Sequence, residues 1–165
     1  MSVLALVAGM AVLSTGAAAA PPADHMTARS NYLERCGGCH GVQGRAFAPT
    51  VPDLRDRAGW FLCDAAGRDY VARLPNIVFS RLTDVDLAEM LNYVVFDLGG
   101  ASAPKTARRY TASEVAATRR EPLSTTDLET YRTQVVKTLI ARCGAPEALA
   151  TDYAPKLSPN ESGSR

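Results

Sequence analysis

Residues 36–40 read Cys36-Gly37-Gly38-Cys39-His40, and this run holds two of the four cysteines and one of the two histidines in the chain. The C-x-x-C-H spacing is typical of covalent haem attachment. Two thiols three residues apart can reach the two vinyl groups on one edge of a porphyrin, and the adjoining imidazole can then reach the iron. The motif therefore predicts one covalently bound haem c, attached through Cys36 and Cys39, with His40 as an iron ligand.

Three other interpretations of the motif stay open on this pattern alone. A thioredoxin-like dithiol requires a long helix after the second cysteine, and the run Gly41-Val42-Gln43-Gly44 predicts none. A zinc site would combine the motif with Cys63 and Cys143, although these two lack the close spacing of paired zinc ligands. A structural disulfide between the motif cysteines is the third interpretation.

The first twenty residues carry no charged side chain. An apolar run from Val3 to Leu13 is followed by small residues at 17–20, which is the pattern of a secretory signal peptide. Residues 1–20 are therefore predicted to be a signal peptide that directs the protein to the periplasm. An uncleaved membrane anchor is the alternative, because an apolar run of roughly 18 residues lies at the short limit for spanning a bilayer. Export supports the haem prediction, since this kind of attachment takes place outside the bacterial cytoplasm.

Length and charge limit what the rest of the chain can be. With 165 residues there is room for one domain and an addition. A net charge of +1 lacks the basic character of a nucleic-acid-binding protein. After residue 100 the balance shifts, and basic side chains outnumber acidic ones. We expect a haem domain over 25–100, a helical extension over 101–143 and a disordered polar tail over 144–165.

Apolar spacing and turn residues predict an all-α chain. The clearest helix covers 84–98, with apolar residues three and four apart, Thr83 as its N-cap and Gly99 after its end. Loops are expected at 41–56 and 74–80, where glycines and prolines interrupt the pattern. The other predicted helices cover 27–36, 57–73, 112–120 and 127–141, the last capped by Thr125 or Thr126.

Residues 27–98 also resemble the class I, mitochondrial-type cytochromes c. The residues that carry the resemblance, besides the motif, are Tyr32, Gly41, Pro52-Asp53-Leu54, Leu82-Thr83-Asp84, Leu87, Met90 and Tyr93. The family implies a small class I cytochrome c core wrapped round one haem, here followed by a C-terminal helical extension.

The resemblance also implies roles for individual residues. His40 would be the proximal iron ligand, and the carbonyl of Pro52 would accept the other ring N–H of His40 and so fix its orientation. Leu54 would pack on a face of the haem. Tyr32 on the first helix would meet Tyr93 on the last helix, where these two helices cross.

The distal ligand is where this chain departs from the family. A methionine, commonly in a Met-Pro pair, binds the iron in class I cytochromes, and the corresponding pair here is Leu74-Pro75. Met90 aligns with a buried apolar position, so we expect it to pack in the core, with iron ligation as the alternative. Cys63 could offer a thiolate, but a disulfide with Cys143 is expected in an oxidising compartment. A five-coordinate or weakly ligated haem is the remaining option.

Electron transfer to or from a periplasmic redox protein is the function that these features favour. An enzyme is not expected, because His25 is the one histidine besides His40 and no distal acid or base stands out. An open iron position would instead suit a small-ligand sensor or a weak peroxidase. The extension would suit an accessory subunit of a periplasmic dehydrogenase or oxidase. The pairs Arg108-Arg109 and Arg119-Arg120 are expected to be solvated.

Overall fold

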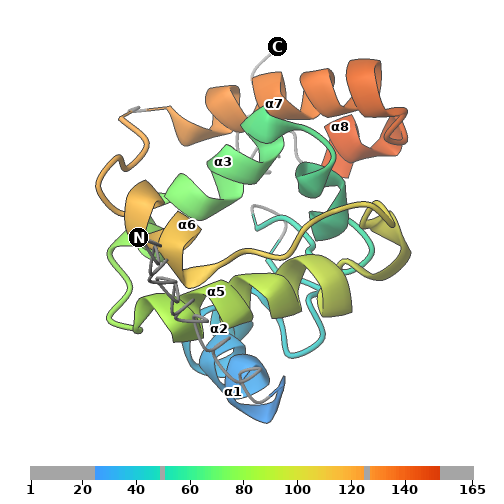
Figure 1. The fold of residues 1–165 in the computed structure, drawn as a ribbon. Helices are drawn as coiled ribbons and strands as arrows, with labels where there is room; N and C mark the ends of the chain where they lie inside the picture. The colour runs from blue at the N-terminus through green and yellow to red at the C-terminus, as the bar shows by residue number, and fades with distance from the viewer. Residues whose placement is uncertain (1–24, 49–50, 125–126, 153–165) are drawn as a thin grey trace, which may run out of the picture.

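The computed structural model describes residues 25–48, 51–124 and 127–152. Within these ranges the chain forms helices and no strand, so the all-α prediction is confirmed. Figure 1 shows α7 at the top, α3 beneath it, and α5 with α1 at the bottom. The predicted signal peptide at 1–20 lies outside the described residues. None of the helices in the described ranges has the length and hydropathy that a bilayer crossing requires.

Helix α1 (His25–Arg35) packs against α5 (Asp84–Asn92) near the N-terminal end of the described chain. Ala28 is buried in the core that they share, and the rings of Tyr32 and Tyr93 lie 5.6 Å apart, as the resemblance implies. The side chain of Thr83 accepts a hydrogen bond from the N–H of Asp86 and caps α5 as predicted. The predicted helix at 84–98 continues as η2 (Tyr93–Leu98), which has π-helical hydrogen bonding.

The middle of the chain departs from the predicted single helix at 57–73. It forms η1 (Ala58–Leu62) and α3 (Ala65–Arg73), with a break at Cys63 and Asp64. The break follows from capping, because the Asp64 carboxylate accepts a hydrogen bond from the N–H of Ala66 at 2.9 Å and starts a new helix there. The predicted loop at 74–80 contains the short helix α4 (Pro75–Val78), which begins with proline at a position where proline is favoured.

The extension forms α6 (Ala112–Thr118), α7 (Leu128–Cys143) and α8 (Ala148–Asp152). Asp127 caps α7 by accepting a hydrogen bond from the N–H of Thr130 at 2.9 Å, and Thr125 and Thr126, the predicted caps, lie outside the described residues. The expected disordered tail from residue 144 needs correction, because Leu149 is only 1% exposed and packs under α7. Residues 153–165 lie outside the described ranges.

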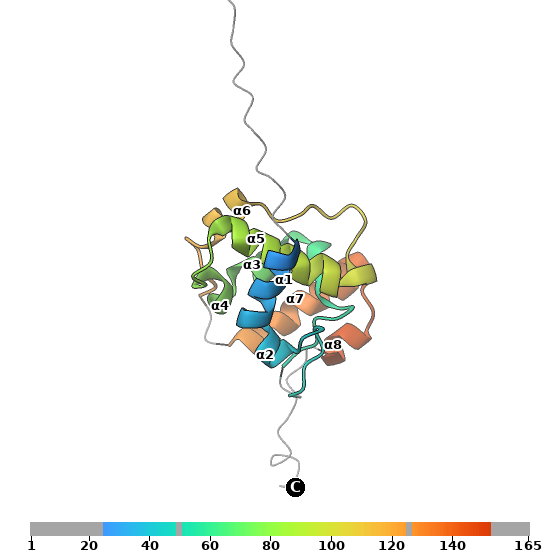
Figure 2. The same ribbon diagram turned by 90° about the horizontal axis from the view of Figure 1, so that it is seen from below.

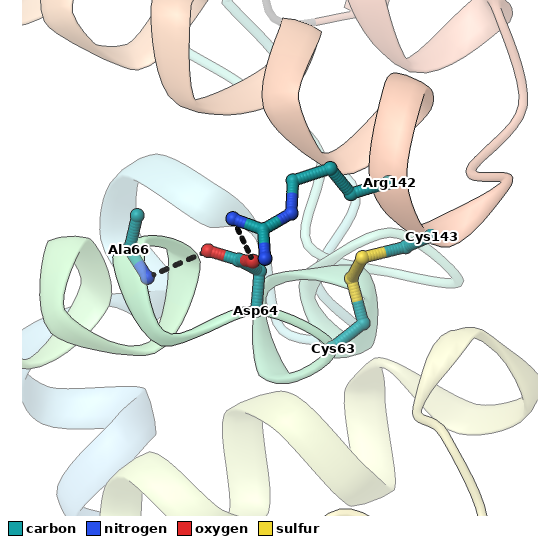
Figure 3. Close-up of a disulfide and its surroundings, with 5 residues drawn as sticks. All are labelled: Cys63, Asp64, Ala66, Arg142 and Cys143. Atoms are coloured by element: carbon teal, nitrogen blue, oxygen red, sulfur yellow. Dashed lines mark hydrogen bonds and ion pairs between the residues drawn. A yellow bond between two sulfur atoms is a disulfide. The ribbon is translucent and has the colours of Figure 1, made fainter.

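A covalent link holds the end of α7 to the start of α3. Cys63 and Cys143 form a disulfide, as predicted, across a sequence separation of 80 residues. Beside it, the guanidinium of Arg142 lies 3.1 Å from the carboxylate of Asp64, the residue that caps α3 (Figure 3). The cap at Asp64, its ion pair with Arg142 and the disulfide therefore all hold the start of α3 beside the end of α7.

The extension shares the core of residues 25–100 instead of forming a separate unit. Asn92 is fully buried on α5, and its side-chain amide donates to the carbonyl of Tyr110 and accepts from its N–H at 3.0 and 2.7 Å. Arg108, Arg109 and Arg120 are exposed, as expected of solvated pairs, whereas Arg119 is half-buried. Arg109 and Arg119 also form ion pairs with acidic residues of α5. The predicted boundary near residue 100 therefore marks a change in composition and does not separate two cores. Tyr110 and Val115 pack in the same hydrophobic core as α1 and α5.

Candidate functional site

The C-x-x-C-H motif folds as one compact turn after α1. The N–H of Cys36 donates to the carbonyl of Tyr32 at 2.8 Å, so Cys36 continues the hydrogen bonding of that helix. The next helix, α2 (Gly37–His40), has four residues, and the N–H groups of Cys39 and His40 both donate to the carbonyl of Cys36. Both motif cysteines are free thiols, with Cys36 half-buried and Cys39 exposed. The alternative interpretation of the motif as a structural disulfide is therefore not supported.

His40 is oriented by a hydrogen bond to the backbone. Its Nδ1 lies 2.9 Å from the carbonyl oxygen of Pro52, the contact that the resemblance implies. A carbonyl oxygen only accepts, so Nδ1 carries the proton and Nε2 is the nitrogen left for a metal. Burial lowers the pKa of His40, which favours the neutral imidazole that a metal ion binds.

A tightly folded loop brings Pro52 back to His40. Gly41 and Gly44 both have positive φ, at 74° and 77°. At Gly41 a Cβ would lie 2.1 Å from the carbonyl oxygen of Arg45, so no other residue fits there without a shift. The carbonyl of Gly44 accepts from the N–H of Leu54 at 2.8 Å, which places Leu54 against the motif.

An apolar cavity lies beside the motif, between α2, α3, α5 and α7. The empty space between these elements is about 670 Å³, a figure that includes open solvent at its mouth. Figure 2 shows α1, α2 and α5 on the near side of the molecule and α7 beyond them. The lining residues are Cys36, His40, Pro52, Leu54, Ala58, Phe61, Tyr70, Val71, Leu74, Asn76, Ile77, Met90, Leu91, Val94, Val95 and Arg132.

The residues present fit a covalently held haem. Cys36 and His40 lie at the wall of the cavity, together with both Pro52 and Leu54 from the loop. The other walls are mostly aliphatic, which suits a large flat macrocycle. Cys36 and Cys39 would hold the vinyl groups and His40 the iron, and the group would supply one-electron redox chemistry. Of the predicted site residues, Cys39 is the one outside the cavity lining.

Leu74 and Met90 both line the cavity, from different elements. Leu74 precedes α4 and has no atom that can bind a metal. Met90 on α5 is 1% exposed and packs in the hydrophobic core that α1 and α5 share, as expected of an apolar position. Cys63 is bonded to Cys143 and offers no thiolate. The identity of the distal ligand therefore stays a prediction.

Three polar cavity residues, Tyr70, Asn76 and Arg132, were missed by the sequence analysis. Tyr70, on α3, is 6% exposed, and Arg132, on α7, comes from the extension. Burial raises the pKa of Tyr70, and the positive charge of Arg132 opposes that rise. A single arginine in a helix of the extension has no spacing or neighbouring motif that would have marked it as a cavity residue.

The alternative interpretations of the motif find little support in this geometry. Burial raises the pKa of the Cys36 thiol to about 11, whereas the reactive cysteine of a redox dithiol has a lowered pKa. The four-cysteine zinc site is not assembled, because Cys63 and Cys143 are bonded to each other. Across the described residues, no group of three or more His, Cys, Asp or Glu side chains could hold a metal ion.

Comparison of the chain with protein-family models, with curated proteins and with solved structures finds no match.

Proposed function

We propose that this protein is an exported monohaem c-type cytochrome, with the haem attached through Cys36 and Cys39 and ligated by His40. The observation that carries the proposal is the His40 Nδ1 to Pro52 carbonyl hydrogen bond at the wall of an apolar cavity. It leaves Nε2 unprotonated, as a proximal ligand requires. The crossing of α1 with α5 and the contact of Tyr32 with Tyr93 agree with a class I cytochrome c core.

Single-electron transfer with a redox protein in the periplasm is the activity that this site supports best. Aliphatic walls exclude water, and a rigid, hydrogen-bonded His40 limits the rearrangement that a change of charge would cause. Residues Cys36, Asn76, Ile77 and Met90 also line a second hollow, which opens at the surface beside the exposed side chains of Arg35, Phe79 and Arg81. A partner with an acidic docking face fits this basic, partly apolar rim.

Reversible binding of a small ligand is the second candidate, and Leu74 is the observation that favours it. A leucine stands where the family has its methionine ligand, and it lines the cavity without offering a donor atom. A sensor or weak peroxidase would need such an open position. Tyr70, Asn76 and Arg132 are polar side chains of the cavity lining that could act on a ligand there.

The test is to express the protein in a strain competent for cytochrome c maturation and to extract it with acid acetone. We expect the haem to stay on the polypeptide and the intact mass to exceed the apoprotein mass by one haem. Cys36→Ser and Cys39→Ser should each leave one thioether bond, which shifts the pyridine haemochrome band, and the double variant should lose the haem. Extractable haem, or none, would refute the proposal.

A further inference from the structure

Arg119, the residue that follows α6, reaches the segment that joins α4 to α5. Its Nη2 donates to the carbonyl of Ser80 at 3.2 Å and to the carbonyl of Leu82 at 2.7 Å. Its Nε lies 3.2 Å from Oδ1 of Asp84, an ion-pair contact outside hydrogen-bond geometry. One guanidinium of the extension therefore holds both this segment and the first turn of α5.

Helix α6 gives Arg119 a fixed position. The helix lies beside α5 (Figure 1 and Figure 2), and its Val115 is 1% exposed in the core that α1 and α5 share. The carboxylate of Glu114, also on α6, accepts from the guanidinium of Arg68 on α3 at 2.7 Å. Arg119 itself is half-buried, and hydrogen bonds from a charged donor are stronger than those between neutral groups. The segment is therefore attached to a well-packed element.

The two carbonyls that Arg119 holds belong to the residues on either side of Arg81. Arg81 is exposed and lines the second hollow together with Phe79 and Ser80. The hydroxyl oxygen of Ser80 accepts from the N–H of Leu82 at 3.3 Å, which closes a local turn across Arg81. Because its backbone is held on both sides, the base of the Arg81 side chain is fixed at the rim of the hollow and keeps only rotamer freedom.

The second hollow adjoins the cavity of the proposed haem. The two spaces share part of their lining, and the shared residues are Cys36, Asn76, Ile77 and Met90. The attachment point at Cys36 therefore also lies in the wall of the hollow, whose rim Arg35 and Arg81 make basic. Cations at such a rim attract an approaching anionic group, and the strength of the attraction depends on where the charges stand.

We propose that Arg119 is a positioning residue for partner recognition: it holds residues 80–82 so that Arg81 stands at the rim of the second hollow and attracts an acidic group of the redox partner. The inference rests on the proposed function, because it requires a haem attached beside the hollow. It gives the extension a role in recognition, although none of the described residues of the extension lines the hollow.

The first measurement is amide hydrogen exchange of residues 80–82 in the holoprotein, followed by mass spectrometry. Arg119→Met keeps an unbranched side chain and removes every hydrogen-bond donor. Exchange at 80–82 should accelerate about tenfold or more, because the charge-assisted hydrogen bonds to this segment are lost. Arg120→Met, at the exposed neighbouring position, is the matched control and should exchange like the wild type.

The second measurement is stopped-flow oxidation of the ferrous protein at low salt, in which one electron passes from the haem to ferricyanide and yields ferrocyanide. Arg119→Met should slow this reaction about twofold and should speed oxidation by a cationic cobalt(III) complex. A general loss of stability would not change the two rates in opposite directions. In an Arg81→Gln background, Arg119→Met should change neither rate, because the charge that Arg119 positions is absent.

Two results would overturn the inference. Slowing by the same factor with and without Arg81 would show that Arg119 acts through its own charge, and unchanged exchange at 80–82 in Arg119→Met would show that it does not hold the segment. If Arg119→Met does not fold, Arg119→Lys takes its place with the same expectations, because the lysine ammonium ends short of the position of Nη2. Wild-type protein without covalent haem overturns the proposed function itself, and the acid-acetone extraction detects this before any rate is measured.

Discussion

Leu74 and Met90 differ in what each can offer an iron atom, and both side chains line the cavity. The thioether of a methionine is a soft donor that stabilises ferrous iron, and axial ligands spread haem potentials over roughly 0.8 V. The hydrocarbon side chain of Leu74 has no such effect. Under the proposed function, the residue at this one position would decide between a six-coordinate electron carrier and an iron with a free position.

Replacing Leu74→Met should create a low-spin haem with the weak far-red absorption of a methionine–iron bond. The swap conserves volume, so it should cost under about 1.5 kcal/mol in packing. The reduction potential should rise, and carbon monoxide should bind less readily. Visible spectra in both oxidation states and a potentiometric titration check these outcomes.

Met90→Leu is the control for that experiment, because Met90 lines the same cavity from α5. We expect its spectrum to match the wild type, since Met90 packs in the core. A far-red band in the wild type that disappears in Met90→Leu would identify Met90 as the ligand, and Leu74 would then have no role at the iron.

At the scale of elements, one ion pair attaches α6 to α3. Arg68 donates to the carboxylate of Glu114 at 2.7 Å and to the carbonyls of Arg108 and Arg109 at 2.7 and 3.0 Å. Its guanidinium also lies 4.1 Å from the centre of the Tyr110 ring. Arg68 thus links the start of the extension to α3, in addition to the hydrogen bonds by which Asn92 links it to α5.

Glu114→Gln should destabilise the protein by about 1.5–3 kcal/mol at neutral pH, the range for a hydrogen bond to a charged group. The hydrogen bond from Arg68 lowers the pKa of Glu114 below its ordinary value of 4.5. The stabilisation is therefore full above that value and is lost as the pH falls through the lower, folded pKa. Urea unfolding at several pH values should show the two proteins converging in acid.

Glu89→Gln provides the comparison, because Glu89 pairs with a largely exposed Arg109 at 2.7 Å. A solvent-exposed pair contributes about 0–1 kcal/mol, so this variant should unfold close to the wild type. A Glu114→Gln protein as stable as Glu89→Gln at neutral pH would contradict the role assigned to Arg68.

At the scale of the whole molecule, the disulfide and two hydrophobic clusters join the extension to residues 25–100. Val71 and Leu74 contact both clusters, so the two cores meet along α3. Helix α3 lies between α5 and α7 in Figure 1, and the cavity is lined from both sides of it. The extension is therefore part of the wall round the cofactor position.

Changing both cysteines, Cys63→Ser with Cys143→Ser, should lower the free energy of unfolding by about 2–5 kcal/mol. The link constrains the unfolded chain across 80 residues, so its loss acts mainly on that state. Because neither cysteine lines the cavity, the haem spectrum should stay that of the wild type. Equal urea midpoints before and after the change, or a free thiol in alkylated wild-type protein, would argue against the link.

Electron exchange through the second hollow should depend on the basic side chains at its rim. Arg81→Gln should slow oxidation of the ferrous protein by anionic ferricyanide about twofold or more at low salt, and should speed oxidation by a cationic cobalt(III) complex. High salt should remove both effects. Stopped-flow absorbance measures the rates, and Arg120→Gln is the control. Equal effects of the two substitutions would place the electron path elsewhere.

Part of this architecture follows from local sequence signals. The turn at Cys36 to His40 and the cap of α5 at Thr83 depend on residues that are close along the chain. The hydrogen bond from His40 to Pro52 follows from family resemblance over a short loop. The disulfide was predicted because Cys63 and Cys143 are the two cysteines that the motif leaves over. Signals of this kind need no knowledge of how distant helices pack.

Other features were decided by tertiary structure. The break at Asp64 is a competition between a continuous helix and a new cap, which the ion pair with Arg142 and the nearby disulfide favour. Asn92 on α5 has no local partner, and its two hydrogen bonds to Tyr110 form once α6 packs against that helix. The helix propensity of a short stretch of sequence takes account of neither interaction.

The sequence by itself determined the chemistry that the protein can hold, through the spacing of Cys36, Cys39 and His40 and through the leucine at position 74. Only the tertiary structure decided what surrounds that chemistry, because it brought Arg132 and Tyr70 into the lining of one cavity. The physical reason is the distance along the chain over which each interaction acts. Motif spacing acts along a few covalent bonds, whereas the place of a charged side chain depends on which helix faces bury together when the whole chain folds.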